Sequence, residues 1–366
     1  MSNFARIPAL DGVRGFATLM VLSSHFMFAD VYGTNTWWPV LDIGWLGVDL
    51  FFVLSGFLIT GILLNTKGRP KYFREFYRRR VLRIFPLYYA VLLFSVFAIL
   101  VIDQKPENLW KGYDSLAWFF AFIPNVAIAL KGYGEAHGDL WQTNWAGLHH
   151  LWSLAVEEQY YIIWPLIVWL LPRRPLLFFC TALLISGYYF REWTDLIFHE
   201  KWSEASYVLP YCRMDGLAGG SLMAILFKRN WLKKSMLERD FIRDLTFFCG
   251  MALLYLIVCG DSQWRGTVVA LMFTGIVYLA LQSEGFFHNL FEIPFLRHIG
   301  TYSYGLYVFH QMFRMPFEWY IRRPLENLGL PIGVVQILYL FLAFGATYAL
   351  ARLSWKYWEK PFLEMK

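Results

Sequence analysis

Long apolar stretches alternate with short polar gaps from one end of the sequence to the other. Each stretch is roughly 17 to 25 residues long, which is the length that an α-helix needs to cross a hydrocarbon core. The gaps hold most of the charged residues and leave no room for a soluble domain. The pattern predicts an all-α fold, a polytopic membrane helical bundle in which residues 1–366 form a single transmembrane domain. Its spans, about ten in number, lie near residues 9–29, 44–64, 84–102, 150–171, 175–190, 207–227, 242–260, 265–282, 299–317 and 332–353.

The basic run KGRPKYFREFYRRRVLR, residues 67–83, orients these spans. Loops rich in Lys and Arg face the cytoplasm, and this rule places both the N-terminus and the C-terminus inside. The apolar segment Leu116–Leu130 is short, and counting it as a span would move Arg173 and Arg174 outside. We therefore interpret it as re-entrant or interfacial. The pair Arg322 and Arg323 then lies outside, against the rule.

Composition supports a lipid environment, since 58% of the residues are hydrophobic and 20% are aromatic. The net charge of +6 comes from basic blocks at the ends of apolar stretches, which topology explains without nucleic acid as a partner. The first stretch, Leu10–Phe28, contains Asp11, Arg14 and His25, so we interpret it as a retained span and not as a signal peptide. The predicted location is the cell membrane (inner or plasma), multi-pass. Four cysteines lie in apolar segments without metal-ligand spacing.

Charged and polar residues inside the predicted spans are the candidates for function, because such residues are costly in lipid. On the first span, His25 lies ~16 Å further along the helix than Arg14. Asp49 enters the second span at about the depth of His25, which makes an Asp and His pair plausible, and Ser55 lies near the middle. The fourth span adds His149, His150, Trp152, Ser153, Glu157 and Glu158; the sixth adds Tyr211, Arg213 and Asp215; the ninth adds Tyr302, Ser303 and His310.

His25 is the strongest candidate for proton transfer, because imidazole titrates near neutral pH. With a carboxylate such as Asp49 orienting it, His25 could act as a general base on an attacking hydroxyl. The alternative is an interfacial histidine that is hydrogen-bonded to a neighbouring helix.

Two pairs of charged residues, Arg80 with Arg83 and Asp11 with Arg14, each allow a functional and a structural interpretation. Arg80 and Arg83 share one helix face at the entry of the third span, where they suit the phosphates of an anionic cofactor or simply orient the helix. Arg14 could neutralise Asp11, three residues away, or grip the same cofactor.

Adjacent Glu157 and Glu158 cannot share a helix face, so one could be a functional acid and the other a helix-end or interhelical hydrogen-bond partner. Trp152, Tyr160 and Tyr161 fit interfacial anchors better than ligand platforms.

Seven segments together resemble the membrane acyltransferase 3 family, in the same order and over nearly the whole chain: LDGVRGFATLMVLSSHF, GVDLFFVLSGFLIT, RRRVLRIFPLYY, HLWSLAVEEQYY, RMDGLAGG, IGTYSYGLYVFH and WEKPF. The resemblance implies an acyl-CoA-dependent O-acyltransferase. Members transfer acyl groups, most often acetyl from acetyl-CoA, to hydroxyls of extracytoplasmic polysaccharides, lipid-linked sugars, peptidoglycan or small metabolites. The implied partners are therefore acyl-CoA from the cytoplasm, a carbohydrate or other hydroxyl acceptor, and membrane lipid.

The resemblance also implies roles for single residues. Arg14 and His25 match the family's arginine, ten-residue gap and histidine, and Arg80 with Arg83 match its RxxR motif. No metal is expected. The resulting assignment is catalytic for His25, Arg14, Asp49, Glu157 and Glu158; cofactor-binding for Arg80, Arg83, Arg14, Tyr302 and Ser303; and substrate-binding for His150, Trp152, Ser153, Arg213 and Asp215.

Some members append an esterase-like domain, and this chain ends at Lys366 without one, so we expect the stand-alone form with direct delivery to the acceptor. Direct transfer and an acyl-enzyme relay both remain open.

The main alternative function is a proton-coupled multi-pass transporter, because charged residues within spans also mark ion pathways. A scaffold for other membrane proteins would leave the buried Arg, His and Glu residues unexplained.

Overall fold

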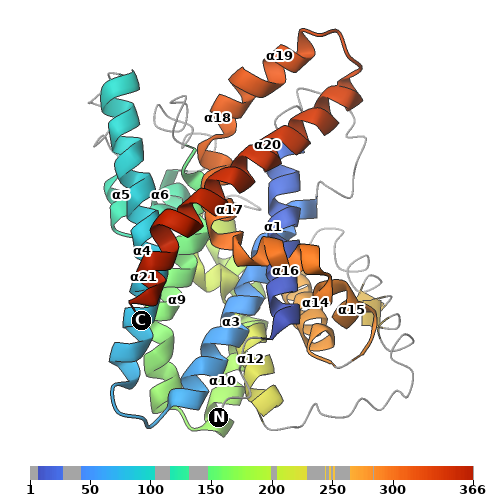
Figure 1. The fold of residues 1–366 in the computed structure, drawn as a ribbon. Helices are drawn as coiled ribbons and strands as arrows, with labels where there is room; N and C mark the ends of the chain where they lie inside the picture. Colours follow the sequence, from blue (N-terminus) through green and yellow to red (C-terminus); the bar gives the residue numbers. More distant parts are fainter. Residues whose placement is uncertain are drawn as a thin grey trace. The chain divides into compact units, whose positions relative to one another are not determined.

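The structure is a computed structural model that describes residues 7–27, 43–103, 116–131, 147–198, 204–228, 244, 247–248, 250–251, 264–282 and 284–365. Within these ranges every regular element is a helix, which confirms the predicted all-α fold (Figure 1). Among the described residues, three helical segments are long and apolar enough to cross a membrane: Ile43–Thr66, Tyr72–Phe97 and Ile332–Glu364. Trp264–Ala280 is apolar but shorter. These helices are those of a membrane protein, whereas the count of ten spans and the cytoplasmic termini stay predictions.

Within the described residues the helices fall where the apolar stretches predicted them, with differences at several ends. Helix α10 (Arg173–Phe198) continues past the predicted end at residue 190, and the predicted span 207–227 is divided among α11 (Glu204–Val208), η7 (Pro210–Arg213) and α12 (Met214–Lys228). Helix α4 (Tyr72–Phe97) begins well before the predicted start at residue 84, because the arginines of the basic run are good helix formers. The predicted span 299–317 is divided, since α16 (Pro294–Thr301) ends before Tyr302 and α17 (Ser303–Met312) begins after it. Most of the predicted span 242–260 lies outside the described residues.

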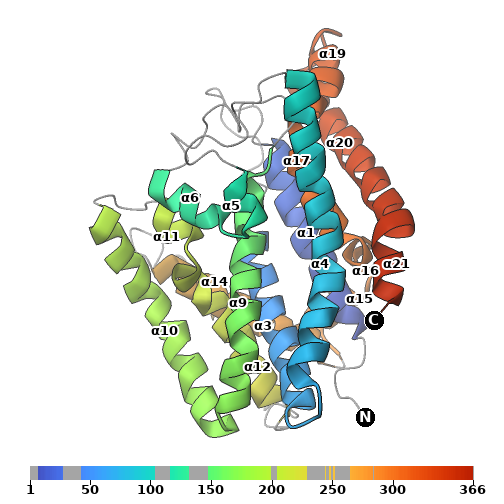
Figure 2. The ribbon, with the colours of Figure 1, turned by 90° about the vertical axis from the view of Figure 1, so that its left-hand side faces the viewer.

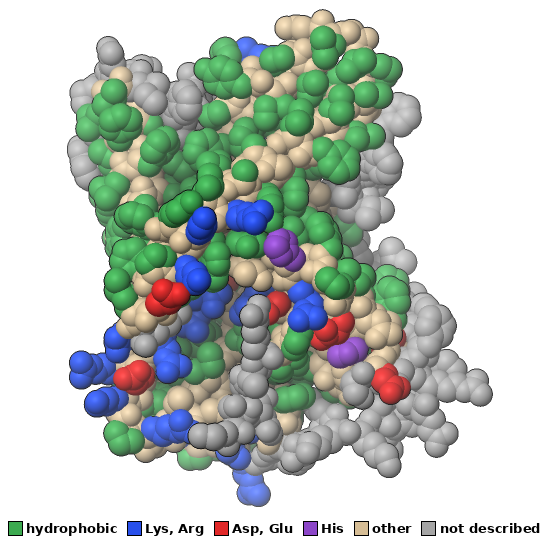
Figure 3. Space-filling view, viewed as in Figure 1, with side chains coloured by type: hydrophobic (Ala, Val, Ile, Leu, Met, Phe, Trp, Pro, Cys, Tyr) green, Lys and Arg blue, Asp and Glu red, His purple; other side chains and the backbone are tan. Residues whose placement is uncertain are grey.

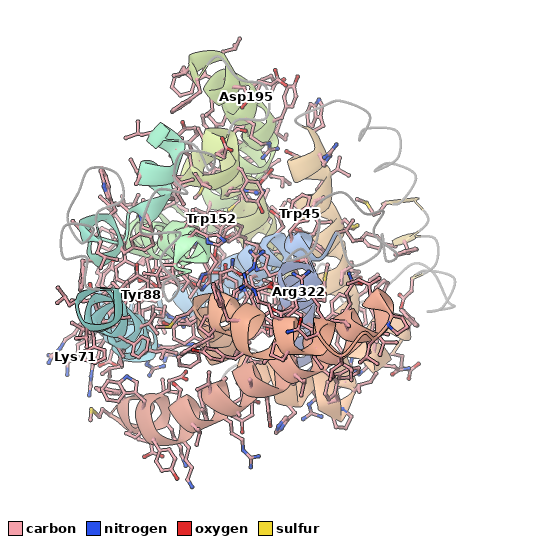
Figure 4. All side chains as sticks on the ribbon, turned by 90° about the horizontal axis from the view of Figure 1, so that it is seen from above. Trp45, Lys71, Tyr88, Trp152, Asp195 and Arg322 are labelled. Carbon is pink, nitrogen blue, oxygen red and sulfur yellow. The ribbon has the colours of Figure 1, made fainter. Side chains whose placement is uncertain are left out.

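The segment Leu116–Leu130 forms two short helices, α5 (Ala117–Phe120) and α6 (Pro124–Lys131). Phe122 separates them in the left-handed region, at φ 56°. Its ring stacks on that of Tyr88 of α4 at a centroid distance of 4.0 Å, and the Tyr88 hydroxyl, labelled in Figure 4, donates to the Phe119 carbonyl at 2.8 Å. Neither helix is long enough to cross a bilayer, while the re-entrant or interfacial position stays a prediction.

Contacts group the chain into two compact units. Unit 1 comprises Met1–Ala17, Val48–Arg74 and Val156–Gly300, and unit 2 comprises Thr18–Gly47, Glu75–Ala155 and Thr301–Lys366. The boundaries fall inside helices such as α1 (Pro8–Met27) and α9 (Trp152–Leu170), so the units are not successive sequence domains. The single-domain prediction is not tested by this division.

Unit 1 is held together by close helix packing. A Cβ on Gly220 would lie 1.9 Å from the Val53 carbonyl oxygen, and one on Gly56 would lie 2.0 Å from that of Leu217. Small residues therefore bring two helix backbones into contact, as is usual in membrane bundles. Figure 2 shows α10 and α12 side by side in this unit. Besides the start of α1 and most of α9, its helices are α3 (Gly47–Thr66), α10 (Arg173–Phe198), α11 (Glu204–Val208), η7 (Pro210–Arg213), α12 (Met214–Lys228), α14 (Trp264–Ala280), α15 (Phe286–Glu292) and α16.

Unit 2 pairs the C-terminal helices with α4. The indole of Trp358 donates to the Pro86 carbonyl at 2.9 Å, which fits the position of the C-terminal helix beside α4 in Figures 1 and 2. Besides α4 to α6 and α17, its elements are η2 (Ile43–Leu46), η3 (Ala98–Asp103), η6 (His149–Leu151), α18 (Arg314–Phe317), η8 (Glu318–Arg322), α19 (Arg323–Glu326), α20 (Ile332–Ser354), η9 (Trp355–Glu359) and α21 (Lys360–Glu364).

The outer faces of these elements divide by polarity. Hydrophobic side chains cover α20, where Phe341 is 70% exposed, and Lys and Arg gather over the start of α4 (Figure 3). Apolar side chains along the outside of one helix and basic side chains at the end of another fit helices that meet lipid along their length and water at their ends.

Candidate active site

His25, on α1, contacts a second histidine from a distant part of the sequence. Its Nδ1 lies 2.7 Å from Nε2 of His310, on α17. The two rings are nearly coplanar, with an interplanar angle of 7° and a centroid separation of 5.0 Å. Both residues belong to unit 2, where His25 is half-buried and His310 is fully buried. The side chain of His25, the predicted catalytic residue, is therefore hydrogen-bonded to the imidazole of His310.

A third histidine and two hydroxyls complete the group around His310. The ring of His150 lies edge-on to that of His310 at a centroid distance of 5.0 Å. The hydroxyl of Tyr307 donates to the His150 carbonyl at 3.0 Å and also contacts the hydroxyl of Ser153. We call His25, His150, Ser153, Tyr307 and His310 the histidine cluster. It brings together the predicted catalytic His25 and the predicted substrate-binding His150 and Ser153.

Local sequence explains how two of these elements present their side chains. On α17, Tyr307 and His310 are three residues apart and so share a helix face. The short helix η6 precedes α9 and contains His150. The backbone carbonyl of His150 accepts a hydrogen bond from the Ser153 hydroxyl at 3.2 Å. Trp152, labelled in Figure 4, begins α9 and is buried, so its ring is packed inside the protein. Its predicted role as a substrate ligand stays a prediction.

Arg80 and Arg83 of α4 also belong to unit 2, as does the start of α17. Arg80 and Arg83 are partly exposed, and Arg80 lies over the ring of Phe76 at 5.9 Å from its centroid. The Tyr304 hydroxyl donates to the Ile84 carbonyl at 2.7 Å, directly after Arg83. This contact brings Tyr302 and Ser303, two predicted cofactor ligands, to the same part of unit 2 as the two predicted arginines.

Arg83 has a counter-charge nearby. It interacts electrostatically with Glu359, whose carboxylate accepts a hydrogen bond from Ser354 at 2.9 Å. Glu359 belongs to the WEKPF segment and is buried. An anionic ligand at Arg83 would therefore lie in the electrostatic field of Glu359 as well.

Three predicted residues of unit 1, Asp49, Arg213 and Asp215, take part in buried ion pairs. Arg213 pairs with Asp49 at 3.1 Å, and Arg191 pairs with Asp215 at 2.7 Å. Arg191 also donates to the hydroxyl of Thr267 at 2.8 Å, which ties α10 to α14. These partners account for the burial of Asp49, Arg213 and Asp215 without a substrate. Their predicted catalytic and substrate-binding roles, including the pairing of Asp49 with His25, stay predictions.

The two adjacent glutamates have different surroundings. Glu157 accepts hydrogen bonds from Ser55 at 3.0 Å and from Tyr161 at 2.8 Å. Glu158 points to another face of α9 and is buried, with 8% of its surface exposed. Glu157 therefore makes an interhelical hydrogen bond with Ser55, and the catalytic roles predicted for Glu157 and Glu158 stay predictions.

Arg14 pairs with Asp11 at 3.2 Å, as one of the two sequence readings proposed. Asp11 is held in place by close packing, since a Cβ on Gly300 would lie 1.8 Å from its carbonyl oxygen. The Arg14 side chain remains 22% exposed, so the ion pair leaves part of the guanidinium accessible.

Sequence reasoning missed the partners that complete these groups. His310 was noticed only as a polar residue of its span, and Tyr307, Arg191 and Glu359 were not assigned. The helical spacing in YVFH was a signal for Tyr307 and His310 sharing a face. Arg191 lies one residue beyond the predicted end of its span, 175–190, and a longer span would have made it a buried charge to explain.

Comparison with known proteins identifies the family. Residues 7–355 match the family described as "Acyltransferase domain", the acyltransferase 3 family. The chain belongs to this family. No solved structure matches it.

Three relatives align with 97% of this acyltransferase chain. It is 28% identical to YrhL of Bacillus subtilis, 27% to the peptidoglycan O-acetyltransferase OatA of Listeria monocytogenes, and 28% to the O-acetyltransferase OatA of Staphylococcus aureus. The chain covers 54%, 55% and 57% of these proteins, so it spans little more than half the length of the curated relatives that it matches. The family resemblance seen in the motifs is confirmed.

Proposed function

We propose that this acyltransferase moves an acetyl group from acetyl-CoA to a hydroxyl of a cell-surface carbohydrate polymer. Peptidoglycan is the first acceptor to test, because the Listeria monocytogenes relative is named a peptidoglycan O-acetyltransferase. The enzyme would be a multi-pass protein of the cell (inner or plasma) membrane with both termini in the cytoplasm. No metal ion enters the proposal.

The observation that carries this proposal is the histidine cluster of unit 2. His25 is half-buried and its Nδ1 is engaged by His310 at 2.7 Å, so Nε2 is the ring nitrogen that would take a proton from a reactant. His150 and Ser153 of the same cluster are suited to orient an acceptor hydroxyl through their polar atoms. Unit 2 also contains Arg80 and Arg83, which match the arginine motif of the family. A histidine pair with only a structural role would leave this motif unexplained.

The donor would bind through charge. Arg80 and Arg83 offer guanidinium groups to the phosphates of acetyl-CoA. The role of Arg14, a residue of unit 1, as a cofactor ligand stays a prediction from the sequence. Tyr302 and Ser303 would add contacts at the start of α17. Because α17 also carries His310, one helix links the proposed donor site with the proposed base.

The chemical step then balances as follows. His25 takes the proton of the acceptor hydroxyl, whose oxygen attacks the thioester carbonyl carbon. The carbon–sulfur bond breaks, the acetyl group stays on the acceptor oxygen, and the coenzyme A thiolate receives the proton. This direct route is the one that we propose over an acyl-enzyme relay, because it needs only groups of the histidine cluster.

The experiment supplies radiolabelled acetyl-CoA to membranes that contain the protein, with peptidoglycan fragments, a neutral glucan and small alcohols as acceptors. We expect label on the carbohydrate and free coenzyme A in equal amounts. The double variant Arg80→Ala/Arg83→Ala should raise the KM for acetyl-CoA by about tenfold or more, since a charge-assisted hydrogen bond contributes roughly 1.5–3 kcal/mol. Arg79→Ala, an exposed arginine on the same helix, is the matched control. Wild-type protein that never consumes the thioester would refute the proposal.

A further inference from the structure

We propose that His310 is a positioning residue that fixes the tautomer of His25 and shares the proton that His25 takes from the acceptor. The inference rests on the proposed function, because it treats His25 as the general base. His310 lies 285 residues away in sequence, yet its Nε2 is 2.7 Å from Nδ1 of His25. Nearly coplanar rings with centroids 5.0 Å apart are joined edge to edge, so this contact is an in-plane hydrogen bond and not a face-to-face stack.

The direction of the hydrogen bonds follows from the backbone. Nδ1 of His310 lies 2.6 Å from the carbonyl oxygen of Tyr307, and a carbonyl can only accept, so this Nδ1 carries the hydrogen. A neutral His310 then has its lone pair on Nε2. That nitrogen must accept from His25, whose Nδ1 therefore carries a hydrogen. The lone pair of His25 is left on Nε2, the nitrogen that faces away from His310.

This arrangement gives the proton a defined place during transfer. When Nε2 of His25 takes the acceptor's proton, His25 becomes an imidazolium that still donates from Nδ1 to His310. The Nδ1 proton can move to Nε2 of His310, which is then a cation stabilised by the Tyr307 carbonyl. The proton returns by the same route when the coenzyme A thiolate is protonated, so neither histidine keeps a charge at the end of the cycle.

The charged and titratable groups around His25 and His310 fit a neutral His310 that accepts the hydrogen bond from His25. Among the described residues, the groups that interact electrostatically with His310 are His25, His149 and His150, and Arg314 acts on His25. These neighbours are neutral or positive, so the role that a carboxylate has in a serine hydrolase triad falls to an imidazole held by a carbonyl. The edge of Phe26 packs against the His310 ring, and His310 is fully buried, which fixes the ring.

The test compares two substitutions of His310 in the full chain. His310→Leu removes the acceptor, whereas His310→Gln keeps an oxygen that can accept from Nδ1 of His25. We expect His310→Leu to lower kcat by about 100-fold or more, the usual share of a positioned base, with the KM for acetyl-CoA near its wild-type value. His310→Gln should recover a clear part of kcat. Combined with His25→Ala, His310→Leu should add no further loss, because the two residues act as one unit.

A spectroscopic readout tests the tautomer without relying on turnover. Nitrogen-15 NMR of histidine-labelled protein distinguishes protonated from unprotonated ring nitrogens, and the spectrum of His25→Gln assigns His25 among the 8 histidines. In wild type, Nδ1 of His25 should be protonated and Nε2 unprotonated. In His310→Leu the Nε2-protonated form should appear.

Each outcome has a separate meaning. A wild-type His25 protonated at Nε2, or a His310→Leu variant with wild-type kcat, would overturn the inference. Equal loss of kcat in His310→Leu and His310→Gln, with an unchanged His25 tautomer, would leave His310 a packing residue and would also overturn it. Absence of acetyl transfer by wild type would refute the proposed function, while the nitrogen signals would still test the tautomer.

Discussion

The hydroxyl of Tyr304 donates to the backbone carbonyl of Ile84 at 2.7 Å. Ile84 follows Arg83 in α4, and Tyr304 lies at the start of α17, the helix that carries His310. At ~1.5 Å per residue, roughly 9 Å of α17 separates Tyr304 from His310. One short helix therefore sets the spacing between the proposed donor-binding arginines and the proposed base within unit 2.

Tyr304→Phe should loosen the donor site and leave the base intact. The substitution removes one hydrogen bond, which contributes about 1 kcal/mol, so the KM for acetyl-CoA should rise about fivefold. The kcat at saturating donor should stay close to wild type. Steady-state kinetics with labelled acetyl-CoA measure both constants, and a fall in kcat at unchanged KM would contradict the proposed coupling.

The buried Arg191–Asp215 pair should be essential for stability. Arg191→Ala leaves the Asp215 carboxylate buried without its partner, which should cost about 3–5 kcal/mol. Thermal unfolding in detergent measures the loss. The matched control is Arg297→Ala, because the Arg297–Glu292 pair is partly exposed, at 42% and 31%, and should contribute less than about 1 kcal/mol. Equal effects of the two substitutions would show that the buried pair has no special role.

Gly220 should tolerate no side chain. In Gly220→Ala the new Cβ would lie 1.9 Å from the Val53 carbonyl oxygen, so α3 and α12 must separate, at a cost of about 1–3 kcal/mol. Gly333→Ala provides the control, since its Cβ meets nothing within 4 Å and alanine is the better helix former. The unfolding midpoint should fall for the first variant and stay or rise for the second. A Gly220→Ala protein as stable as wild type would mean that these helices do not touch.

Glu157 and Glu158 should behave differently in double-mutant cycles with Tyr161→Phe. Tyr161 donates to Glu157, so the free energies of unfolding of Glu157→Ala and Tyr161→Phe should not add, with a coupling of about 1 kcal/mol. Glu158→Ala should add to Tyr161→Phe, because it lies on another face of α9. Coupling to Glu158 in place of Glu157 would contradict the observed hydrogen bonds.

The sequence was sufficient to predict the helices, since apolar length and charge placement are local properties. It also indicated His25, His150 and Ser153, which the fold brings into one cluster. It did not identify His310 as the partner of His25, because contact between α1 and α17 depends on packing that no local pattern encodes. The same holds for Arg191, which is an isolated charge until the fold places it beside Asp215. The division of Leu116–Leu130 at Phe122 depends on stacking against Tyr88, a contact that hydropathy does not report.

The most direct test of the account is acetyl transfer by His25→Ala and His298→Ala at matched expression. His298 is an exposed histidine of α16, outside the histidine cluster, and should retain wild-type turnover when replaced. His25→Ala should lose transfer by about 100-fold or more while still binding acetyl-CoA, because a general base acts on the chemical step. Wild-type turnover in His25→Ala would contradict the assignment of His25 as the base.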